Sequence, residues 1–318
     1  MLQILNVIVP IYVLIGIGYV MTRFGPFKKD EMRILGKFVL NLALPALIMR
    51  SLSQHAIQDV LNLSYLTAYF LGTAAMIALG YLWCLVKARQ DMLTATFHVI
   101  GMSCTNSGFI GYPILLLVLP AIAGNVLALN MLVENLLIIP FLLFMAERGR
   151  NAQTGGSMIL STLYGLRYNP VVIGIVGGIL LSFTGLSLPP FVARSIDLCA
   201  SASSAASLFV IGGTLVGISL KKESLQAAPV IIGKLILHPL LVLGAVMLIG
   251  HAGMTPLEPT YQMSILLMAA TPMMGIYPTL AQAYGRAQPS AVSLLLATLV
   301  SFFTLSAFLW VMQGGSAG

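Results

Sequence analysis

The chain has 318 residues, of which 58% are hydrophobic and 8% charged, and its formal net charge is +7 at neutral pH. A soluble domain carries charges on about a quarter of its residues, so this composition excludes a soluble globular protein and indicates a chain that lies in lipid. The cations are scattered between apolar segments instead of gathering on one face, so no nucleic-acid partner is expected.

Ten apolar segments are candidates for membrane-spanning helices, each of which needs about 20 residues to cross the hydrocarbon core. The first has no Lys or Arg before it and exceeds the core of a signal peptide, so we expect it to be retained. In chain order we expect the spans at 2–22, 33–53, 62–86, 93–119, 125–145, 169–184, 190–219, 228–250, 261–284 and 290–312.

The Lys and Arg residues occupy alternate connections between these spans. Positively charged connections remain in the cytoplasm, so odd-numbered spans are expected to run inward and both termini to lie outside. The other connections hold little besides Arg50 and Arg194, at span edges. The cations after spans 1, 3, 5, 7 and 9 are Arg23, Lys28, Lys29, Arg33, Lys37, Lys87, Arg89, Arg148, Arg150, Arg167, Lys221, Lys222 and Arg286.

A Tyr-Pro pair occurs at 112–113 and again at 277–278, a shift of 165 positions that also carries the first five spans close to the last five. Because five is odd, the second copy would enter the membrane from the opposite side, and the halves are expected to be inverted repeats, a common plan of secondary transporters. We expect the first repeat at 1–146, a short cytoplasmic linker at 147–167 and the second repeat at 168–318. The fold class expected is thus an all-α polytopic membrane protein of ten transmembrane helices.

Two expected spans are interrupted at matching places, TNSGFIGYPI at 105–114 and ATPMMGIYPT at 270–279. Proline has no N–H and frees the carbonyl four residues before it, so Pro113 is expected to free that of Phe109. In hydrocarbon such groups persist only inside protein or beside a water-filled cavity. The broken helices are therefore expected to cross near the midplane, where half-helix N-termini favour an anion and freed carbonyls could hold Na⁺.

The candidate substrate-binding residues come from these breaks and from NLALPALI in span 2, where Asn41 precedes Pro45 by one turn. The amide of Asn106 can donate to a carboxylate, and Thr271 is its counterpart after the shift. A capped kink is the alternative for span 2. The serines of LCASASSAASLFVIGG in span 7 are expected to serve close helix packing, with a wall of the substrate path as the alternative. The expected set is Asn41, Pro45, Asn106, Ser107, Gly108, Tyr112, Pro113, Thr271, Pro272, Tyr277 and Pro278.

Ionisable residues inside spans are further candidates, since a charge at the bilayer centre costs at least about 2.5–3.5 kcal/mol. Glu134 in span 5, one turn after Asn130, is expected to couple a proton or hold Na⁺. His238 in span 8 could titrate near neutral pH or cap the kink before Pro239. Lys234 lies one turn earlier on the same face and is expected to snorkel to the cytoplasmic end.

Six blocks resemble the auxin efflux carrier family in its bacterial branch, in family order over nearly the whole chain. The most specific is Asn106 followed by Gly111 and Pro113, and its partner is Gly275-Ile276-x-Pro278. The blocks are LNLALPALI (40–48), TNSGFIGYPI (105–114), YNPVVIGIVGG (168–178), LFVIGGTL (208–215), KLILHPLLV (234–242) and GIYPTLAQAYG (275–285).

The resemblance implies a fold like those of Na⁺/H⁺ antiporters and bile-acid symporters, in which a transport half moves past a scaffold half in an elevator-like motion. It implies a small organic anion as substrate: auxin in plant members, and malonate or similar acids in bacterial ones. Asn106 and the backbone beside Pro113 and Pro278 would contact the carboxylate, with Glu134 nearby. A bacterial inner membrane is the implied location, and association into a homodimer stays open.

Two other functions compete with a carboxylate carrier. An exchanger of Na⁺ or H⁺, or an ion-coupled symporter of another solute, is the first, but exchangers of this fold class place Asp beside the crossover and none lies near either break. A membrane-embedded enzyme is the second, but HExxH, an Asp pair on facing spans and a Ser/His arrangement are missing. We therefore expect no catalytic residue, no metal site and no cofactor apart from Na⁺ or H⁺ as a coupling ion.

Overall fold

The computed structural model describes residues 2–53, 62–150, 168, 170–186, 188–218, 224–282 and 284–314, and the regular elements in these ranges are helices. Most of the expected linker lies outside the described residues, as do Arg167, Lys221 and Lys222 of the expected cationic connections. In chain order the helices, with π-helical turns labelled η, are α1 (Leu2–Arg23), α2 (Lys29–Phe38), η1 (Val39–Ala43), α3 (Leu44–Ser53), α5 (Leu63–Tyr81), η2 (Leu82–Lys87), α6 (Met92–Ser103), η3 (Ser107–Gly111), α7 (Tyr112–Val118), α8 (Ala123–Val133), η4 (Glu134–Ile138), α9 (Ile139–Arg150), α11 (Pro170–Thr184), α12 (Pro190–Ser201), α13 (Ser203–Thr214), α14 (Ser224–Ile232), η5 (Gly233–Leu237), α15 (His238–His251), α16 (Pro259–Ala270), α17 (Tyr277–Gln282) and α18 (Ala287–Gly314).

Six helical segments in the described part of the chain are long and apolar enough to cross a membrane. They are Lys29–Arg50, Leu63–Lys87, Ala123–Arg150, Pro190–Thr214, Ala227–His251 and Ala287–Val311. The shorter apolar helices are Val9–Arg23, Met92–Ser103, Ser107–Val118 and Val172–Thr184. The prediction of an all-helical membrane protein is confirmed at this level. The count of ten spans and their arrangement as inverted repeats stay predictions.

Four of the π-helical turns end two residues before a proline: η1 before Pro45, η3 before Pro113, η4 before Pro140 and η5 before Pro239. A proline ring clashes with the carbonyl four residues earlier and has no N–H to offer it. A wide turn moves that carbonyl aside while the helix continues. The prolines of this chain thus set where several of its helices widen.

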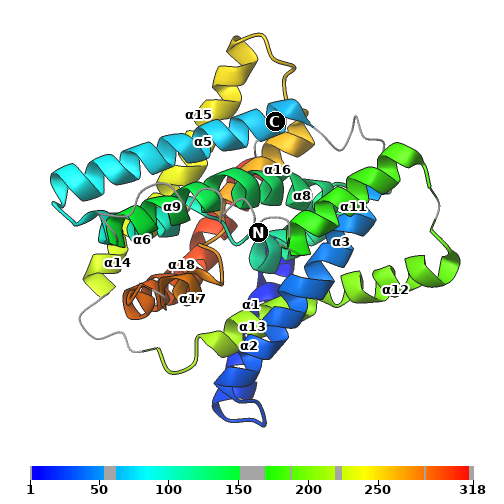
Figure 1. Cartoon of the computed structure of the whole chain (residues 1–318), viewed down its shortest axis with the longest axis horizontal. Coiled ribbons are helices and arrows are strands. Elements are labelled where there is room, and N and C mark those ends of the chain that lie inside the picture. The colour runs from blue at the N-terminus through cyan, green and yellow to red at the C-terminus, as the bar shows by residue number, and fades with distance from the viewer. Residues whose placement is uncertain are drawn as a thin grey trace.

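Close backbone contacts at small residues hold the main helix pairs together. In Figure 1, α5 (cyan) crosses α15 (yellow), and a Cβ on Gly72 of α5 would lie 2.6 Å from the Cα of Val242 of α15. Helices α1 and α13 approach even more closely, because a Cβ on Gly18 would overlap the carbonyl of Phe209. Since lipid competes equally well for apolar side chains, such close packing is what associates helices in a membrane.

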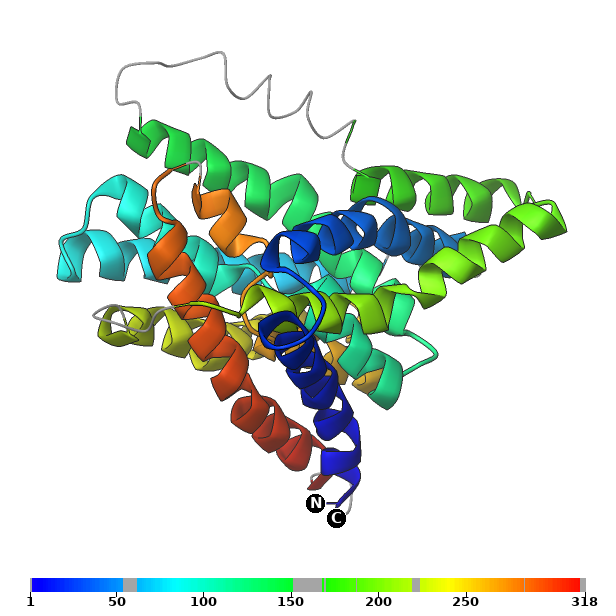
Figure 2. The same ribbon diagram turned by 90° about the horizontal axis from the view of Figure 1, so that it is seen from below.

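Helices α1 and α18 lie side by side although they come from opposite ends of the sequence (Figure 2). The hydroxyl of Tyr12 lies 2.7 Å from Ser301 Oγ and donates to the carbonyl of Thr298 at 3.2 Å. The ring of Tyr12 also packs against Phe302 with centroids 5.0 Å apart. These contacts tie the first helix to the last.

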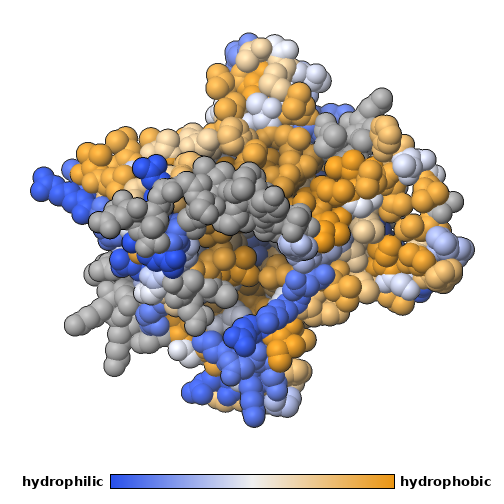
Figure 3. Space-filling view, in the orientation of Figure 1, coloured by the Kyte–Doolittle hydropathy of each residue, from blue (hydrophilic) through white to orange (hydrophobic). Residues whose placement is uncertain are grey.

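The part of the surface that Figure 3 colours by hydropathy is largely apolar, with hydrophilic residues gathered at the left and toward the bottom of the view. Large hydrophobic side chains such as Phe183, Phe303 and Trp310 are exposed, at 73%, 69% and 62% of their surface. On a soluble protein an apolar surface this extensive would cause aggregation. On a membrane protein it is the surface that lipid covers.

Candidate functional site

The two interrupted helices meet at their breaks. Helix α6 ends at Ser103 and α16 ends at Ala270, so each stops where its proline-containing segment begins. Between the breaks, Thr105 and Met273 form an antiparallel bridge, and the backbone N–H of Asn106 donates to the carbonyl of Pro272 at 2.9 Å. Two segments about half the chain apart are thereby joined through their backbones.

The carbonyls freed at the breaks have donors of their own. The hydroxyl of Ser207 on α13 donates to the carbonyl of Phe109 at 3.3 Å. The carbonyl of Met268, four residues before Pro272, accepts from both the backbone N–H and the hydroxyl of Thr271, at 3.1 and 2.8 Å. These oxygens are therefore already paired, which disfavours a cation site built from them. The serine-rich segment of span 7, expected to serve packing, also supplies a donor to the first break.

Asn106 stands at the junction of the breaks with a donor that is not used. Its side chain is 2% exposed, and its Nδ2 has no hydrogen-bond partner among the described residues. Gly275 of the second break leaves room beside this amide, because a Cβ there would lie 3.7 Å from Asn106 Nδ2 and 2.8 Å from Ile211 Cδ1. A buried amide N–H without an acceptor costs about 1–3 kcal/mol, so the position favours a ligand with an acceptor atom.

The carboxylate of Glu134 in η4 accepts hydrogen bonds from residues of the first break. Its Oε1 accepts from the backbone N–H of Thr105 at 2.8 Å, from the hydroxyl of Thr105 at 2.6 Å and from the hydroxyl of Tyr69 at 2.8 Å. Its Oε2 accepts from Ser107 at 3.5 Å. The side chain is 4% exposed, and a buried carboxylate is tolerated only with such donors.

The same cluster continues into α8 and α5. Asn130 donates from Nδ2 to the hydroxyl of Ser107 at 3.3 Å, and its Oδ1 accepts from the hydroxyl of Tyr65 at 2.6 Å. Asn130, Tyr65 and Ser107 are all buried. Asn130, one turn before Glu134, and Tyr65 of α5 thus extend the network of hydrogen bonds around the first break.

A second polar cluster supports the other break, and it corrects one prediction. Lys234 does not snorkel to a membrane surface: it is fully buried, and its Nζ donates to the carbonyl of Ala269 at 2.7 Å. Ala269 lies in the last turn of α16, where the carbonyls have no helical partner and carry the negative end of the helix dipole. The broken helix therefore attracts the ammonium inward.

His238 connects this lysine to α5. Its Nδ1 lies 2.9 Å from Lys234 Nζ, and its Nε2 lies 3.1 Å from the hydroxyl of Thr73. With the ammonium donating to Nδ1, the ring proton stands on Nε2 and faces Thr73. Both ring nitrogens are thus used inside the protein.

The remaining candidates are placed differently. Ser107, Gly108 and Pro113 are buried in the first break, Thr271 and Pro272 are buried in the second, and Pro278 is half-buried. Tyr277 is buried and donates its hydroxyl to the carbonyl of Phe97 at 2.8 Å.

The structure does not bring Asn41 to the breaks. Its side chain is exposed and donates to the carbonyl of Lys37 in its own helix at 2.7 Å. Pro45, one turn later, is buried against α11, where a Cβ on Gly174 would lie 2.8 Å from its Cα. This geometry matches the alternative of a capped kink.

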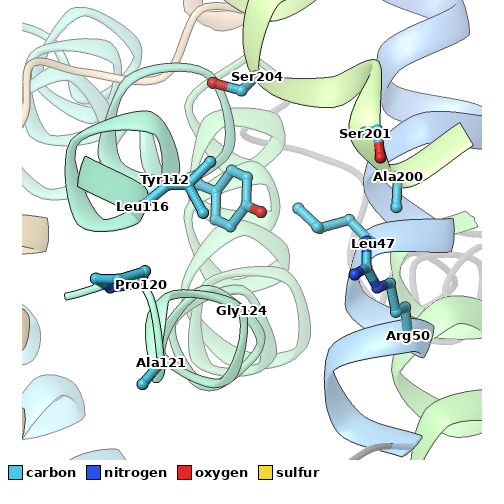
Figure 4. A pocket seen from close by; sticks show the side chains of 10 residues that line it. All are labelled: Leu47, Arg50, Tyr112, Leu116, Pro120, Ala121, Gly124, Ala200, Ser201 and Ser204. Atoms are coloured by element: carbon cyan, nitrogen blue, oxygen red, sulfur yellow. The ribbon is translucent and has the colours of Figure 1, made fainter. Parts of the chain in front are cut away.

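A cavity of about 360 Å³ lies beside the first break, between α3, α7, α8 and α12 (Figure 4). Tyr112 projects into it from one wall and Arg50 from the other. Arg50 also pairs with Asp197 through its Nε at 3.0 Å. Sequence reasoning treated Arg50 only as a cation at a span edge; its place opposite the Tyr-Pro pair comes from the packing of α3 against α8.

Comparison with known proteins points to transport. A family model described as "Membrane transport protein" matches residues 3–311. A putative malonate transporter of Rhizobium meliloti (strain 1021) is 26% identical over 320 residues, which cover 99% of this chain and 98% of that protein. The uncharacterized transporter YfdV of Escherichia coli (strain K12) is 26% identical over 248 residues, 77% of each chain. An uncharacterized transporter of Methanocaldococcus jannaschii is 25% identical over 63% of this chain and 65% of its own.

Proposed function

Because the chain belongs to the family of membrane transport proteins also known as the auxin efflux carriers, we propose that it is a secondary transporter of a small organic anion. It is a multi-pass membrane protein and a transporter, not an enzyme. The solute would bind where the two breaks meet, and an ion gradient or the membrane potential would drive its movement.

The unpaired amide of Asn106 carries this proposal. A buried N–H donor is stabilised by a hydrogen-bond acceptor, and a carboxylate oxygen is a strong acceptor. The carbonyls of Phe109 and Met268 already accept hydrogen bonds, which favours an anion over a bare cation held by these oxygens. The half-helix that begins at Ser107 also turns its positive end toward this point, which favours an anion further.

Malonate is the first substrate to test, since a relative that covers nearly the whole chain is named a putative malonate transporter. At 26% identity the name serves only to rank candidates. Other small mono- and dicarboxylates, including auxin-like acids, belong to the same chemical class and would meet the same donor.

An inverted repeat would explain several contacts between positions about 165 residues apart. Thr73 and His238 are separated by 165 positions and lie in hydrogen-bond contact with each other. Asn106 and Pro272, separated by 166, are joined through their backbones. A residue that touches its own repeat counterpart must lie near the axis relating the two copies. These pairs support repeats at 1–146 and 168–318 that enter the membrane from opposite sides.

Two sets of helices provide the parts for an elevator-like motion. One set, α1, α2, α3, α11, α12 and α13, is connected by mutual contacts, and the other contains α5, α6, α9, α14, α15, α16 and α18. Asn106 lies at the boundary, with Ile211 of the first set and Gly275 of the second break beside it. We assign the scaffold to the first set and the moving part to the second.

Replacement of Asn106 tests the site. Asn106→Ala removes the unpaired donor, and loss of a hydrogen bond to a charged group of about 1.5–3 kcal/mol should weaken apparent affinity about 10- to 150-fold. The measurement is uptake of labelled malonate and related acids into proteoliposomes. Asn135→Ala is the matched control, because among the described residues Asn135 donates to Met131 of its own helix alone, at 2.9 Å. Unchanged uptake by a well-folded Asn106→Ala protein would remove the breaks from substrate binding.

A further inference from the structure

A second cavity, of about 380 Å³, lies between η2, α6, α14 and α18. It shares no lining residue with the cavity of Figure 4. Tyr277 of the second break contributes to its wall, as Tyr112 of the first break contributes to the other cavity. The two tyrosines belong to the repeated Tyr-Pro pairs. Each break therefore has its own cavity, and each cavity contains an arginine, here Arg286.

The wall of this second cavity holds two buried polar atoms that are not used. Gln90 and His98 both line it, and neither Gln90 Oε1 nor His98 Nδ1 has a hydrogen-bond partner among the described residues. Gln90 stands just before α6 and His98 two turns along from it. Two such atoms on residues of one cavity wall are unusual, since buried polar atoms are nearly always paired.

Arg286 retains hydrogen-bonding capacity toward the cavity. Its nearest carboxylate oxygen, Asp91 Oδ2, is 3.6 Å away, beyond the range of a good hydrogen bond. Asp91 instead accepts from the backbone N–H of Thr94 at 3.0 Å and from its hydroxyl at 2.5 Å. The Thr94 hydroxyl holds the pKa of Asp91 below its usual value, so the carboxylate stays ionised and keeps Arg286 at the cavity. The guanidinium has five N–H donors and can bind a carboxylate with two of them.

We propose that this cavity is a second binding site, for a small carboxylate that also carries a hydroxyl or a protonated carboxyl group. Arg286 pairs with the carboxylate, His98 donates to it from Nδ1, and Gln90 Oε1 accepts from the ligand's O–H. The identification of the ligand with the transported class rests on the proposed function above. The cations of the neighbouring connection, Lys87 and Arg89, would draw such an anion to this end of the molecule.

Tryptophan fluorescence can report on this cavity through Trp83, which is 37% exposed and also lines a neighbouring, largely apolar cavity. The chain has two tryptophans; Trp83 lines the cavity, whereas Trp310 is 62% exposed on the apolar surface. In a Trp310→Phe background, titration with malate should change the emission of Trp83 saturably. Malamide, the diamide of malate, which has a similar shape without charge, should not change it.

Variants distinguish this site from the breaks. Arg286→Gln should weaken the malate response at least about tenfold, by the same charge-assisted pairing. Arg286→Lys, which keeps the charge but loses the fork, should weaken it less, and His98→Phe should weaken it without changing the fold of α6. Asn106→Ala should leave it intact, while uptake into proteoliposomes falls.

The outcomes separate the two proposals. A Trp83 response that persists in Asn106→Ala and is lost in Arg286→Gln supports the second site, whatever the uptake shows. No saturable response in a protein that transports malate overturns the second site and leaves the proposed function standing. A response lost equally in Asn106→Ala and Arg286→Gln also overturns it, since one site would then explain both.

Discussion

Glu134 has two roles that a single substitution can separate. Its Oε1 accepts from the backbone N–H and the hydroxyl of Thr105 and from the hydroxyl of Tyr69, and this clamp is a structural role. It is also an ionisable group buried in a membrane-length helix, which is why we propose it, together with His238, as a coupling residue. A clamp needs only acceptor oxygens, whereas coupling needs a group whose charge can change.

Glu134→Gln removes the charge and keeps the size. We expect the dependence of transport on pH or on a Na⁺ gradient to change, because an amide can neither bind a proton at these pH values nor neutralise Na⁺. Uptake rates measured across pH and across Na⁺ gradients check this. Glu258→Gln, at an exposed N-cap outside the cluster, serves as the control. Identical dependence on both ions would leave Glu134 with the structural role alone.

Tyr69→Phe tests the clamp itself. It deletes one donor to Glu134 Oε1 without changing the ring, so we expect a loss of stability of about 0.6–2 kcal/mol, the range found for hydrogen bonds between membrane helices. Thermal unfolding in detergent measures it. Tyr81→Phe, on the same helix, removes only a half-buried contact with Thr96 and should change stability less. Equal effects of the two substitutions would contradict a special role for the Glu134 cluster.

At the scale of elements, prolines and glycines shape the helices in different ways. Prolines widen a helix locally, and this can be anticipated from their position because the clash is with the same chain four residues earlier. Glycines let two helices approach, and their effect depends on the partner. Gly18 and Gly16 stand on one helix, yet a Cβ on Gly18 would overlap the Phe209 backbone, and one on Gly16 would meet nothing within 4 Å.

This pair gives a matched prediction for the crossing of α1 and α13. Gly18→Ala should destabilise the protein by about 1–3 kcal/mol, the usual cost of forcing extra atoms into a packed contact. Gly16→Ala should be neutral or slightly stabilising, since alanine favours the helix. Thermal unfolding of both variants in the same detergent compares them. Equal stability would mean that the two helices are not packed at Gly18.

At the scale of the whole molecule, the cationic connections predict the orientation in the membrane. If both termini lie outside, the cavity of Figure 4, which Ser201 lines, opens to the outside of the membrane, and Lys87 faces the cytoplasm. Cys84 and Cys104 are buried, so a Cys199→Ser protein should react little with a thiol reagent before a new cysteine is introduced.

In that background, Ser201→Cys should react with a membrane-impermeant maleimide on intact cells. Lys87→Cys should react only after the membrane is permeabilised. Both positions are exposed in the structure, so differences in labelling report the side of the membrane. Labelling in the reverse order would contradict the orientation, and labelling of both from the same side would also contradict the inverted arrangement of the halves.

The sequence alone determined the properties that depend on neighbouring residues. Composition identified a membrane protein, hydropathy located its apolar helices, and Pro and Gly marked both breaks. Insertion into lipid and interruption of a helix both depend on residues that are close together in the sequence. The sequence alone did not determine which residues these side chains bond to. Only tertiary packing decided that Lys234 turns inward to the end of α16, that Ser207 meets the carbonyl of Phe109, and that Asn41 stays with its own helix. These bonds join residues that are distant in the chain or choose among several nearby acceptors, and no short stretch contains the information for that choice.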